Sequence, residues 1–390
     1  MTERLYYRDA DLAEFEASLV RTEQVGDKFH SVLERTAFYP TSGGQLHDLG
    51  YLNEVPVVDV REEQEEIVHV TESQVGSKGD TLVGRIDQQR RWRHRQQHTA
   101  QHLLSSIFLR QIGAATVSVH LGEEYGAIEF DIDRANQEDL TQIEDLAFEA
   151  VRDDTPIEVL FVDAAEAEKY NLRRPPKREG TLRLVKIGDV ECVACGGTHC
   201  NSTGQVGMIK LVGTDKLRGH LLVKFLAGSQ ALQDYRVRHE VTDTVSRNLT
   251  SGIKDLPDKI VDMVALEKEL KVRISNLSRE LIAHRVEKAA ELAGSGVYFH
   301  NEELIEDRLL NKLATALADG LDRVTVVEAS TRVIVAAPSG SSCDLRPFAK
   351  EFSTKAGLRG GGSPKLVQFG LSDSLTDQQR RILEETIAID

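Results

Sequence analysis

Histidine and cysteine side chains gather in two short segments of this sequence, with a spacing typical of metal ligands. His98 and His102 stand four residues apart in a segment with helical periodicity, so both imidazoles project from one face of the helix. Two histidines placed in this way supply two of the four ligands of a tetrahedral zinc ion. His94 extends the same face, and spacing alone does not say which pair binds.

The second segment is GDVECVACGGTHCNSTG, in which Cys195 and His199 flank Gly-Gly-Thr. A tight turn with this spacing directs a thiolate and an imidazole to one point, and both suit Zn²⁺. Cys192 and Cys200 lie in the same segment, so two other interpretations stay open: a redox pair of Cys192 and Cys195, or a glycine-rich turn with buried thiols. Together the two segments predict a mixed His/Cys zinc site.

Composition and motifs exclude several classes of protein. The 390 residues are 40% hydrophobic and 28% charged, which excludes wholesale disorder. No apolar run approaches the ~20 residues of a membrane span, and the N-terminus lacks a signal-peptide core, so we expect a cytoplasmic protein without a membrane partner. Four unevenly spaced cysteines argue against a disulfide scaffold. Residue 99 is Thr rather than Glu, which disfavours a zincin-type metallopeptidase.

Negative charge is concentrated near the N-terminus. The formal net charge is −15, from 48 basic and 63 acidic side chains, and the first 80 residues hold 17 acidic and 7 basic ones. The rest of the chain is therefore nearly neutral and can carry basic patches that bind phosphates. We expect such contacts along residues 85–95, 173–224 and 355–365, with much of the acidic N-terminal region facing away from nucleic acid.

The motifs need a scaffold, and the pattern of the chain indicates an α+β multidomain protein. Short alternating strands with frequent turns predict a small N-terminal antiparallel β-barrel, and mixed helices and strands follow it. The helix carrying the histidines is expected to end at Gly113, and a later helix is expected over Asn301–Ala318. The four predicted domains are a barrel at 1–84, an α+β domain with the zinc site at 85–228, a helical, coiled-coil-like segment at 229–294, and a C-terminal α/β domain at 295–390.

Apolar residues of the helical segment form a regular seam. Met263, Leu266, Leu270, Ile274, Leu277 and Leu281 follow one another at intervals of three or four residues. This spacing is typical of a short coiled coil. Two interpretations stay open: a helix packed on its own domain, or a homodimer contact through this helix or the C-terminal domain.

Four motifs, in order, resemble those of one protein family. HTAQHLL (98–104) and CGGTHC (195–200) resemble the editing domain of alanyl-tRNA synthetase and its free-standing AlaX homologues. RTAFYPTSGGQLHDLG (35–50) is similar to the glycine motif of the barrel that precedes this domain. LRGGGSPKLVQFG (358–370) resembles the glycine-rich segment of the synthetase's C-terminal domain, which is also found attached to DHH phosphoesterases. The combination resembles the long type of AlaX.

The resemblance implies a function and a ligand set. It implies a hydrolase that deacylates mischarged Ser-tRNA(Ala), and also Gly-tRNA(Ala), in trans, because no aminoacylation domain precedes the barrel motif. It implies one zinc ion per chain held by His98, His102, Cys195 and His199, and it places Gly43, Gly44 and Gln45 near the editing pocket. Gln45 is then expected to orient the ester or a water molecule. Two alternatives are a deacylase of the threonyl system and a non-catalytic, zinc-containing tRNA-binding protein.

Further residues are expected to select the amino acid and to bind RNA. Strand alternation predicts that Thr116, Ser118 and His120 share one face, where Thr116 and Ser118 would recognise the serine hydroxyl; a merely polar outer face is the alternative. Basic clusters lie beside the metal-ligand motifs, and in the C-terminal motif the backbone N–H groups of glycines 360–362 can meet a phosphate. The residues expected to contact tRNA are Gly43, Gly44, Arg91, Arg93, Arg174, Lys177, Arg359, Gly360, Gly361, Gly362 and Lys365.

Overall fold

The chain forms two compact units, Met1–Val245 and Ser246–Asp390, each with its own core. The computed structural model describes residues 1–170, 172–173, 180–292, 294–372 and 374–387. Helices and several sheets occur in it together, so the expected α+β multidomain class is confirmed. The finer division into four domains stays a prediction.

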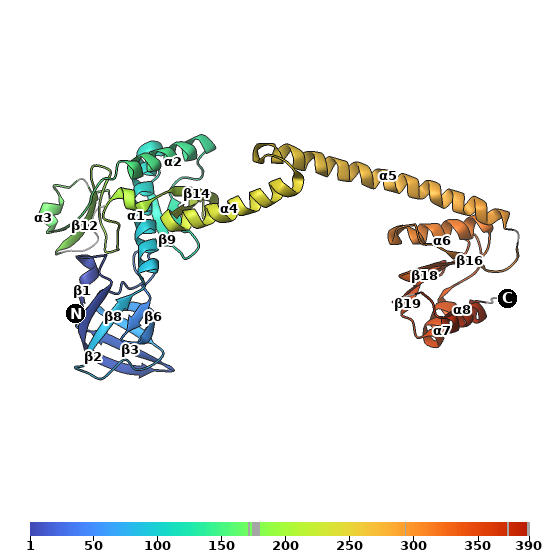
Figure 1. The fold of residues 1–390 in the computed structure, drawn as a ribbon, viewed down its shortest axis with the longest axis horizontal. Helices are drawn as coiled ribbons and strands as arrows, with labels where there is room; N and C mark the ends of the chain where they lie inside the picture. Colours follow the sequence, from blue (N-terminus) through green and yellow to red (C-terminus); the bar gives the residue numbers. More distant parts are fainter. Residues whose placement is uncertain (171, 174–179, 293, 373, 388–390) are drawn as a thin grey trace. The chain divides into compact units, whose positions relative to one another are not determined.

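The N-terminal strands form a closed barrel, drawn in blue in Figure 1. Alternate residues of its first long strand, Phe15, Ala17 and Leu19, point into the barrel core, as the two-residue period of a strand requires. The barrel strands, in their order around it, are β2 (Glu14–Val25), β3 (Lys28–Leu33), β7 (Glu66–Thr71), β6 (Val55–Glu63), β5 (Gly50–Leu52) and β8 (Thr81–Ile86). The short strands β1 (Glu3–Arg4) and β4 (Arg35–Thr36) pair beside it in parallel.

Helix α1 (Gln88–Ile112) leaves the barrel and runs beside α2 and β9 (Figure 1). The Asp87 side chain accepts a hydrogen bond from the Arg90 backbone N–H, which begins the helix. Gly113, with φ at +67°, ends it as expected, because glycine adopts the left-handed conformation without strain. Most of the helix is buried, including Arg90, Arg91 and Arg95, so these side chains need polar partners from their surroundings.

Two antiparallel sheets and helix α2 (Gln137–Arg152) surround α1. The first sheet has the order β14 (Ile209–Leu217), β15 (His220–Ala227), β10 (Gly126–Phe130) and β9 (Thr116–Leu121). The second has the order β11 (Ile157–Val162), β12 (Leu182–Ile187) and β13 (Glu191–Ala194). The short helix α3 (Ala164–Ala167) lies between β11 and β12 in the chain. Apolar residues of α1, α2 and the first sheet make one core, and this core fixes the position of α1.

Two long helices follow, α4 (Gly228–Leu249) and α5 (Leu256–Glu291). The predicted seam lies on α5, and within the single chain its first five residues are exposed to between 41% and 55%. Leu281, the last residue of the seam, packs against the core of the second unit. The interpretation of the seam as a helix packed on its own domain is therefore wrong for residues 263–277.

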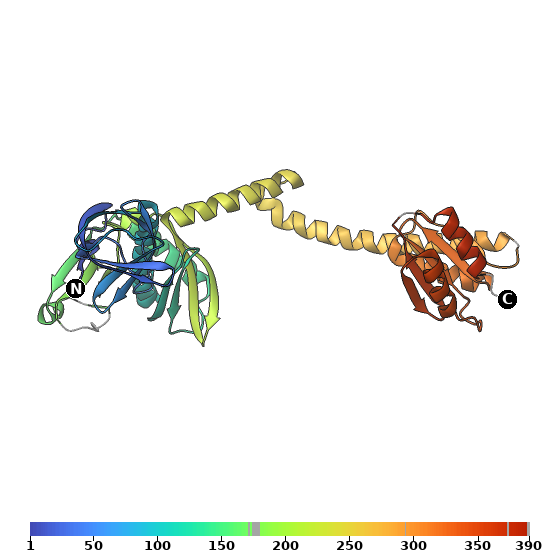
Figure 2. The ribbon, with the colours of Figure 1, turned by 90° about the horizontal axis from the view of Figure 1, so that it is seen from below.

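The second unit has three layers, which Figure 2 shows from below. Its sheet has the order β16 (Tyr298–Asn301), β17 (Thr325–Ala329), β18 (Arg332–Ala336), β20 (Leu366–Gly370) and β19 (Gly360–Ser363). Helix α6 (Asp307–Leu321) and the end of α5 cover one face, and α7 (Arg346–Ala356) and α8 (Asp377–Ile387) cover the other.

Two expectations for this unit need correction. The helix expected to begin at Asn301 begins at Asp307, because residues 298–301 form a strand parallel to β17. The glycine-rich segment 358–370, which its three consecutive glycines favour as a loop, is a β-hairpin in which Gly360, Gly361 and Gly362 pair with β20. A Cβ atom at Gly362 would lie 2.1 Å from the Leu366 backbone oxygen, so the close pairing requires glycine there.

Among the helices of the described residues, none has the length and apolarity needed to cross a lipid bilayer.

Candidate metal centre

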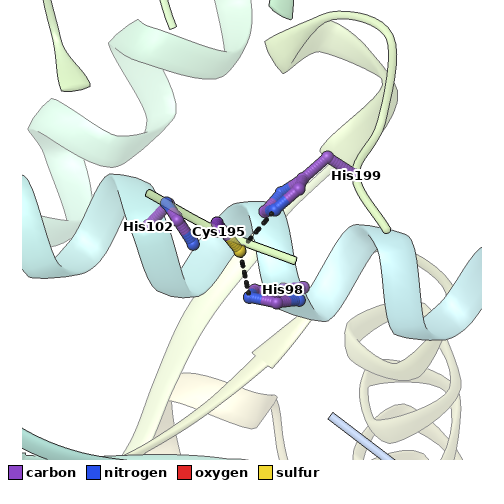
Figure 3. A group of neighbouring side chains, drawn as sticks. All are labelled: His98, His102, Cys195 and His199. Carbon is purple, nitrogen blue, oxygen red and sulfur yellow. Dashed lines mark hydrogen bonds between the residues drawn. The ribbon is translucent and has the colours of Figure 1, made fainter. Parts of the chain in front are cut away.

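Four side chains from two distant segments converge beside the middle of α1. His98 and His102 come from one face of this helix, and Cys195 and His199 come from the turn that follows β13 (Figure 3). Each offers one ligand atom, and these atoms all lie within 4.8 Å of one another. The structure thus brings together the four residues that the sequence motifs predicted.

The donor set and its distances fit a tetrahedral zinc ion. The Cys195 Sγ atom lies 3.5 Å from His98 Nε2 and 3.3 Å from His199 Nε2. Zinc bonds of ~2.1 Å to nitrogen and ~2.3 Å to sulfur, at tetrahedral angles, place the two ligand atoms about 3.6 Å apart. The cluster therefore has almost the dimensions of a zinc site, and zinc is the metal that a Cys/His₃ set favours.

Each imidazole has a separate partner near its other ring nitrogen. His98 Nδ1 donates to Gln45 Oε1 at 2.7 Å. His102 Nδ1 makes no hydrogen bond but lies within ion-pair distance of the Glu191 carboxylate, at 3.5 Å. His199 Nδ1 lies 3.3 Å from the Thr99 hydroxyl oxygen. Partners of this kind fix the orientation of metal-binding histidines and leave Nε2 for the ion.

The Cys/His turn is held against α1 by a buried arginine and by a glycine. Arg95, 1% exposed, donates through Nε to the His199 carbonyl oxygen at 2.6 Å and through a terminal nitrogen to Asn201 at 3.1 Å. A Cβ atom at Gly197 would lie 2.1 Å from His98 Cε1, so the turn can approach the helix only with glycine at this position.

The charges of the cluster favour a bound cation. Burial raises the pKa of Cys195, but the surrounding histidines outweigh it and hold this pKa well below its usual value, which favours the thiolate. Burial lowers the pKa of His199 to about 3, which keeps its imidazole neutral. For His102, burial lowers the pKa, yet Cys195 and Glu191 raise it to about 9. A metal ion bound at the cluster would take the place of the proton that this raised pKa leaves on the His102 ring at neutral pH.

The remaining histidine and cysteines of the two motifs lie outside the cluster. His94 is 3% exposed, its Nε2 has no hydrogen-bond partner, and burial lowers its pKa to about 4. Cys200 is buried in the apolar core, which raises its pKa to about 11. All four cysteines, Cys192 included, are free thiols.

The expected shared face of Thr116 and Ser118 is wrong. A β-bulge between them shifts the register of β9 on β10, so that Thr116 pairs with Phe130 and Ser118 pairs with Glu129. Thr116 is buried toward α1 and donates to the Ser105 hydroxyl at 2.9 Å. Ser118 lies on the other face of the sheet and donates to Glu129 at 2.6 Å.

Two of the expected RNA contacts are occupied within the protein. Arg91 is 1% exposed and forms a buried ion pair with Asp48, and it also donates to the Ala10 and Ala37 carbonyl oxygens. Lys365 Nζ donates to the Ser341 hydroxyl and to two backbone oxygens. The expectation for Arg91 needs correction, because a side chain buried in this way cannot reach RNA, and sequence shows the charge of a side chain but not its partners. Lys365 is partly exposed, and its contact with tRNA stays a prediction.

The other expected RNA contacts are more accessible. Gly43, Arg359, Gly360 and Gly362 are exposed, and Gly44, Arg93 and Gly361 are partly buried. Arg359, Gly360 and Gly361 line a cavity of about 370 Å³ on the C-terminal sheet. Arg174 and Lys177 lie outside the described residues. Whether any of these residues binds tRNA stays a prediction.

A second cavity adjoins the metal cluster, and the sequence motifs did not reveal it. Its volume is about 640 Å³, and Arg110, Lys169, Arg173 and Lys186 supply positive charge to its lining. Its wall includes Glu191, which is 4% exposed, accepts from Arg173 Nε at 2.8 Å and also faces His102. One buried carboxylate thus connects the cavity with the cluster.

Comparison with known proteins points to tRNA synthetases and related proteins. Residues 182–221 match the family described as threonyl and alanyl tRNA synthetase second additional domain, and residues 3–90 match class II (A) tRNA synthetases. The chain is 31% identical over 404 residues to an alanine–tRNA ligase of Archaeoglobus fulgidus, covering 98% of this chain and 43% of the ligase. It therefore spans less than half the length of that relative.

A shorter relative is covered more fully. The chain is 30% identical over 318 residues to the mouse alanyl-tRNA editing protein Aarsd1, and the match covers 77% of each chain. Among solved structures, the C-Ala domain of Aquifex aeolicus alanyl-tRNA synthetase is matched over 25% of this chain and 97% of that chain, at 16% identity and a TM-score of 0.21.

Proposed function

The chain belongs to the family of alanyl-tRNA editing proteins, and on this premise we propose that it is an aminoacyl-tRNA deacylase. Its substrates would be Ser-tRNA(Ala) and Gly-tRNA(Ala), which it would hydrolyse in trans without aminoacylating tRNA itself. The observation that carries this proposal is the convergence of His98, His102, Cys195 and His199, with zinc-site dimensions, in a chain that matches an editing protein over 77% of both lengths.

The metal centre would hold one zinc ion through these four side chains. Zinc supplies Lewis acidity, which polarises a carbonyl group or lowers the pKa of a bound water molecule. The chain's own contribution is orientation: Gln45, Glu191 and Thr99 direct the three imidazoles toward Cys195. Buried surroundings also strengthen every electrostatic interaction at this point.

We propose that the cavity beside Glu191 takes the 3′ end of the tRNA. Its volume of about 640 Å³ lies in the range of small-molecule sites. Arg173 pairs with Glu191 and Lys186 with Glu158, so Lys169 is the lining cation that we expect to meet a phosphate group. Lys169 is exposed at this cavity. A Lys169→Ala substitution should raise KM for the charged tRNA several-fold and leave zinc content unchanged.

Thr116 is the remaining candidate for selection of serine. Its hydroxyl is buried and belongs to a chain of hydrogen bonds with Ser105 and Gln101 on α1. The Thr116 hydroxyl donates to Ser105, and its oxygen can still accept from the hydroxyl of serine, a hydrogen bond that alanine cannot supply. Ser118 lies on the other face of the sheet and lacks this position.

We also propose that the protein forms a homodimer through the seam on α5. Five apolar side chains at coiled-coil spacing, all more than 40% exposed, support this proposal. A Leu270→Glu substitution should convert the dimer to a monomer in sedimentation. A monomeric wild-type protein would refute this part of the proposal.

A non-catalytic, zinc-containing tRNA-binding protein is the second candidate. Four protein ligands fill a tetrahedral zinc ion, and closed sites of this kind are structural in many proteins. The deciding experiment incubates zinc-loaded protein with Ser-, Gly- and Ala-tRNA(Ala), with Ser-tRNA(Thr) as the control for a threonyl system. We expect loss of the first two esters only. Binding of Ser-tRNA(Ala) without loss of the ester would favour the second candidate.

A further inference from the structure

Gln45, a barrel residue, lies buried against the metal cluster and has no exposed surface. Its Oε1 accepts from His98 Nδ1 at 2.7 Å and from the Thr198 backbone N–H at 3.2 Å. Its Nε2 donates to the Thr198 hydroxyl oxygen at 2.9 Å. Both ends of the amide are thus engaged by the protein, which differs from the expectation that Gln45 orients the ester or a water molecule.

These contacts determine the protonation of the His98 ring. A backbone N–H can only donate, so the amide atom that faces Thr198 N and His98 Nδ1 must be the oxygen. The oxygen can only accept, so His98 carries its proton on Nδ1. Nε2 is then the unprotonated nitrogen, and it is the atom that lies 3.5 Å from Cys195 Sγ.

The barrel places Gln45 there by a tight turn. The backbones of Ser42 and Gln45 bond to each other in both directions, at 3.0 and 2.9 Å, and the Gly44 carbonyl accepts from Leu121 of β9 at 2.8 Å. Gly44 has φ at +87°, and a Cβ atom on it would lie 2.7 Å from the Val119 backbone oxygen. Gly44 therefore permits the close approach to β9 that brings Gln45 up to the cluster, and Gly43, with φ at +58°, permits the left-handed backbone of the turn.

We propose that Gln45 is a positioning residue of the metal centre, through which the barrel sets the affinity of the site for zinc. The neutral amide fixes the tautomer and direction of His98 without adding charge, whereas Glu191 supplies a carboxylate beside His102. This inference rests on the zinc site of the proposed function but not on the reaction. Its readout is metal binding, so failure of the inference and failure of the deacylase proposal are distinguishable.

The experiment compares wild type with Gln45→Leu, Gln45→Glu and Gln24→Leu. Leucine removes the acceptor at similar size, and glutamate keeps an accepting oxygen next to His98. The control, Gln24, is an exposed barrel residue whose amide donates to the Gly26 carbonyl at 3.3 Å. Zinc affinity is measured by chelator competition, coordination by the visible spectrum of the Co²⁺-loaded protein, and folding by circular dichroism.

We expect Gln45→Leu to fold and to bind zinc 10- to 100-fold more weakly with an altered Co²⁺ spectrum, as loss of such a partner typically does. Gln45→Glu and Gln24→Leu should stay within a few-fold of wild type. Wild-type affinity and spectrum in Gln45→Leu would overturn the proposal, and so would equal losses in the leucine and glutamate variants. A lower kcat at unchanged zinc affinity would instead make Gln45 a substrate contact and overturn it as well.

Discussion

Replacing Gly197 by alanine should remove His98 from the metal centre. The new Cβ atom would lie 2.1 Å from His98 Cε1 and 2.4 Å from Nδ1. Carbon atoms in contact stay about 3.5 Å apart, so the ring or the turn must move by roughly 1.4 Å. Zinc–ligand distances tolerate only about 0.2 Å, and the His98 bond is therefore lost.

The size of the effect follows from the metal-binding free energy. Structural zinc sites with four ligands contribute about 10–16 kcal/mol, or roughly 2.5–4 kcal/mol for each ligand. Since 1.4 kcal/mol corresponds to a factor of ten, zinc affinity should fall by about two to three orders of magnitude. Deacylation of Ser-tRNA(Ala) should fall with it at limiting zinc.

The neighbouring glycine provides a matched control. A Cβ atom at Gly196 would approach Tyr7 Oη to 3.3 Å, a contact that a shift of a few tenths of an ångström relieves. Chelator competition on Gly196→Ala should give zinc affinity close to wild type. If Gly197→Ala binds zinc as tightly as Gly196→Ala, the packing of the turn against His98 described above is incorrect.

Three further predictions concern ligands, pH and burial. Cys195→Ala should lose zinc and activity whereas Cys192→Ala should keep the wild-type zinc stoichiometry; equal loss in both would mean that the ligand set is misassigned. Burial lowers the pKa of His69 to about 4, so its neutral ring contributes stability above pH 6.5 that is lost as the pH falls toward 4. That loss of stability is about 3 kcal/mol. Denaturant unfolding of His69→Gln should therefore show a free energy of unfolding that depends less on pH over this window than that of the wild type. The same pH dependence in both proteins would contradict the prediction. Arg91→Met should lower the free energy of unfolding by about 3–5 kcal/mol because Asp48 is left buried without its partner, and adding Asp48→Asn should restore part of it. A cost below ~1 kcal/mol for Arg91→Met would contradict the buried ion pair.

The sequence predicted the elements whose cause is local. Gly113 ends α1 as predicted, because glycine adopts the left-handed conformation that stops a helix. His98 and His102 follow from helical spacing, and Cys195 and His199 from the chemistry of a Cys-x3-His turn. The choice of these four over His94 needed the resemblance to a known family.

Features that depend on distant partners were not predictable in this way. The bulge near Val117 reverses the side on which Thr116 lies, and alternation of polar residues carries no sign of it. Arg91 sits in a basic cluster, yet its partner Asp48 is 43 residues away in sequence and only the fold brings them together. Glu191 lies in the segment that carries Cys195 and His199, but its spacing does not show that it faces His102 and lines a cavity.

Helix α1 has a consequence for how the first unit unfolds. Its first turns bury Arg91 and Arg95 against the barrel residues Asp48 and Asp11, its middle carries His98 and His102, and its last turns fill the apolar core with residues such as Leu104. Unfolding the barrel alone would take Asp48 away from Arg91 and Asp11 away from Arg95. Unfolding the other core would remove the packing that holds the helix which the barrel contacts. The barrel and the metal-binding region should therefore melt as one cooperative block, despite having separate hydrophobic cores.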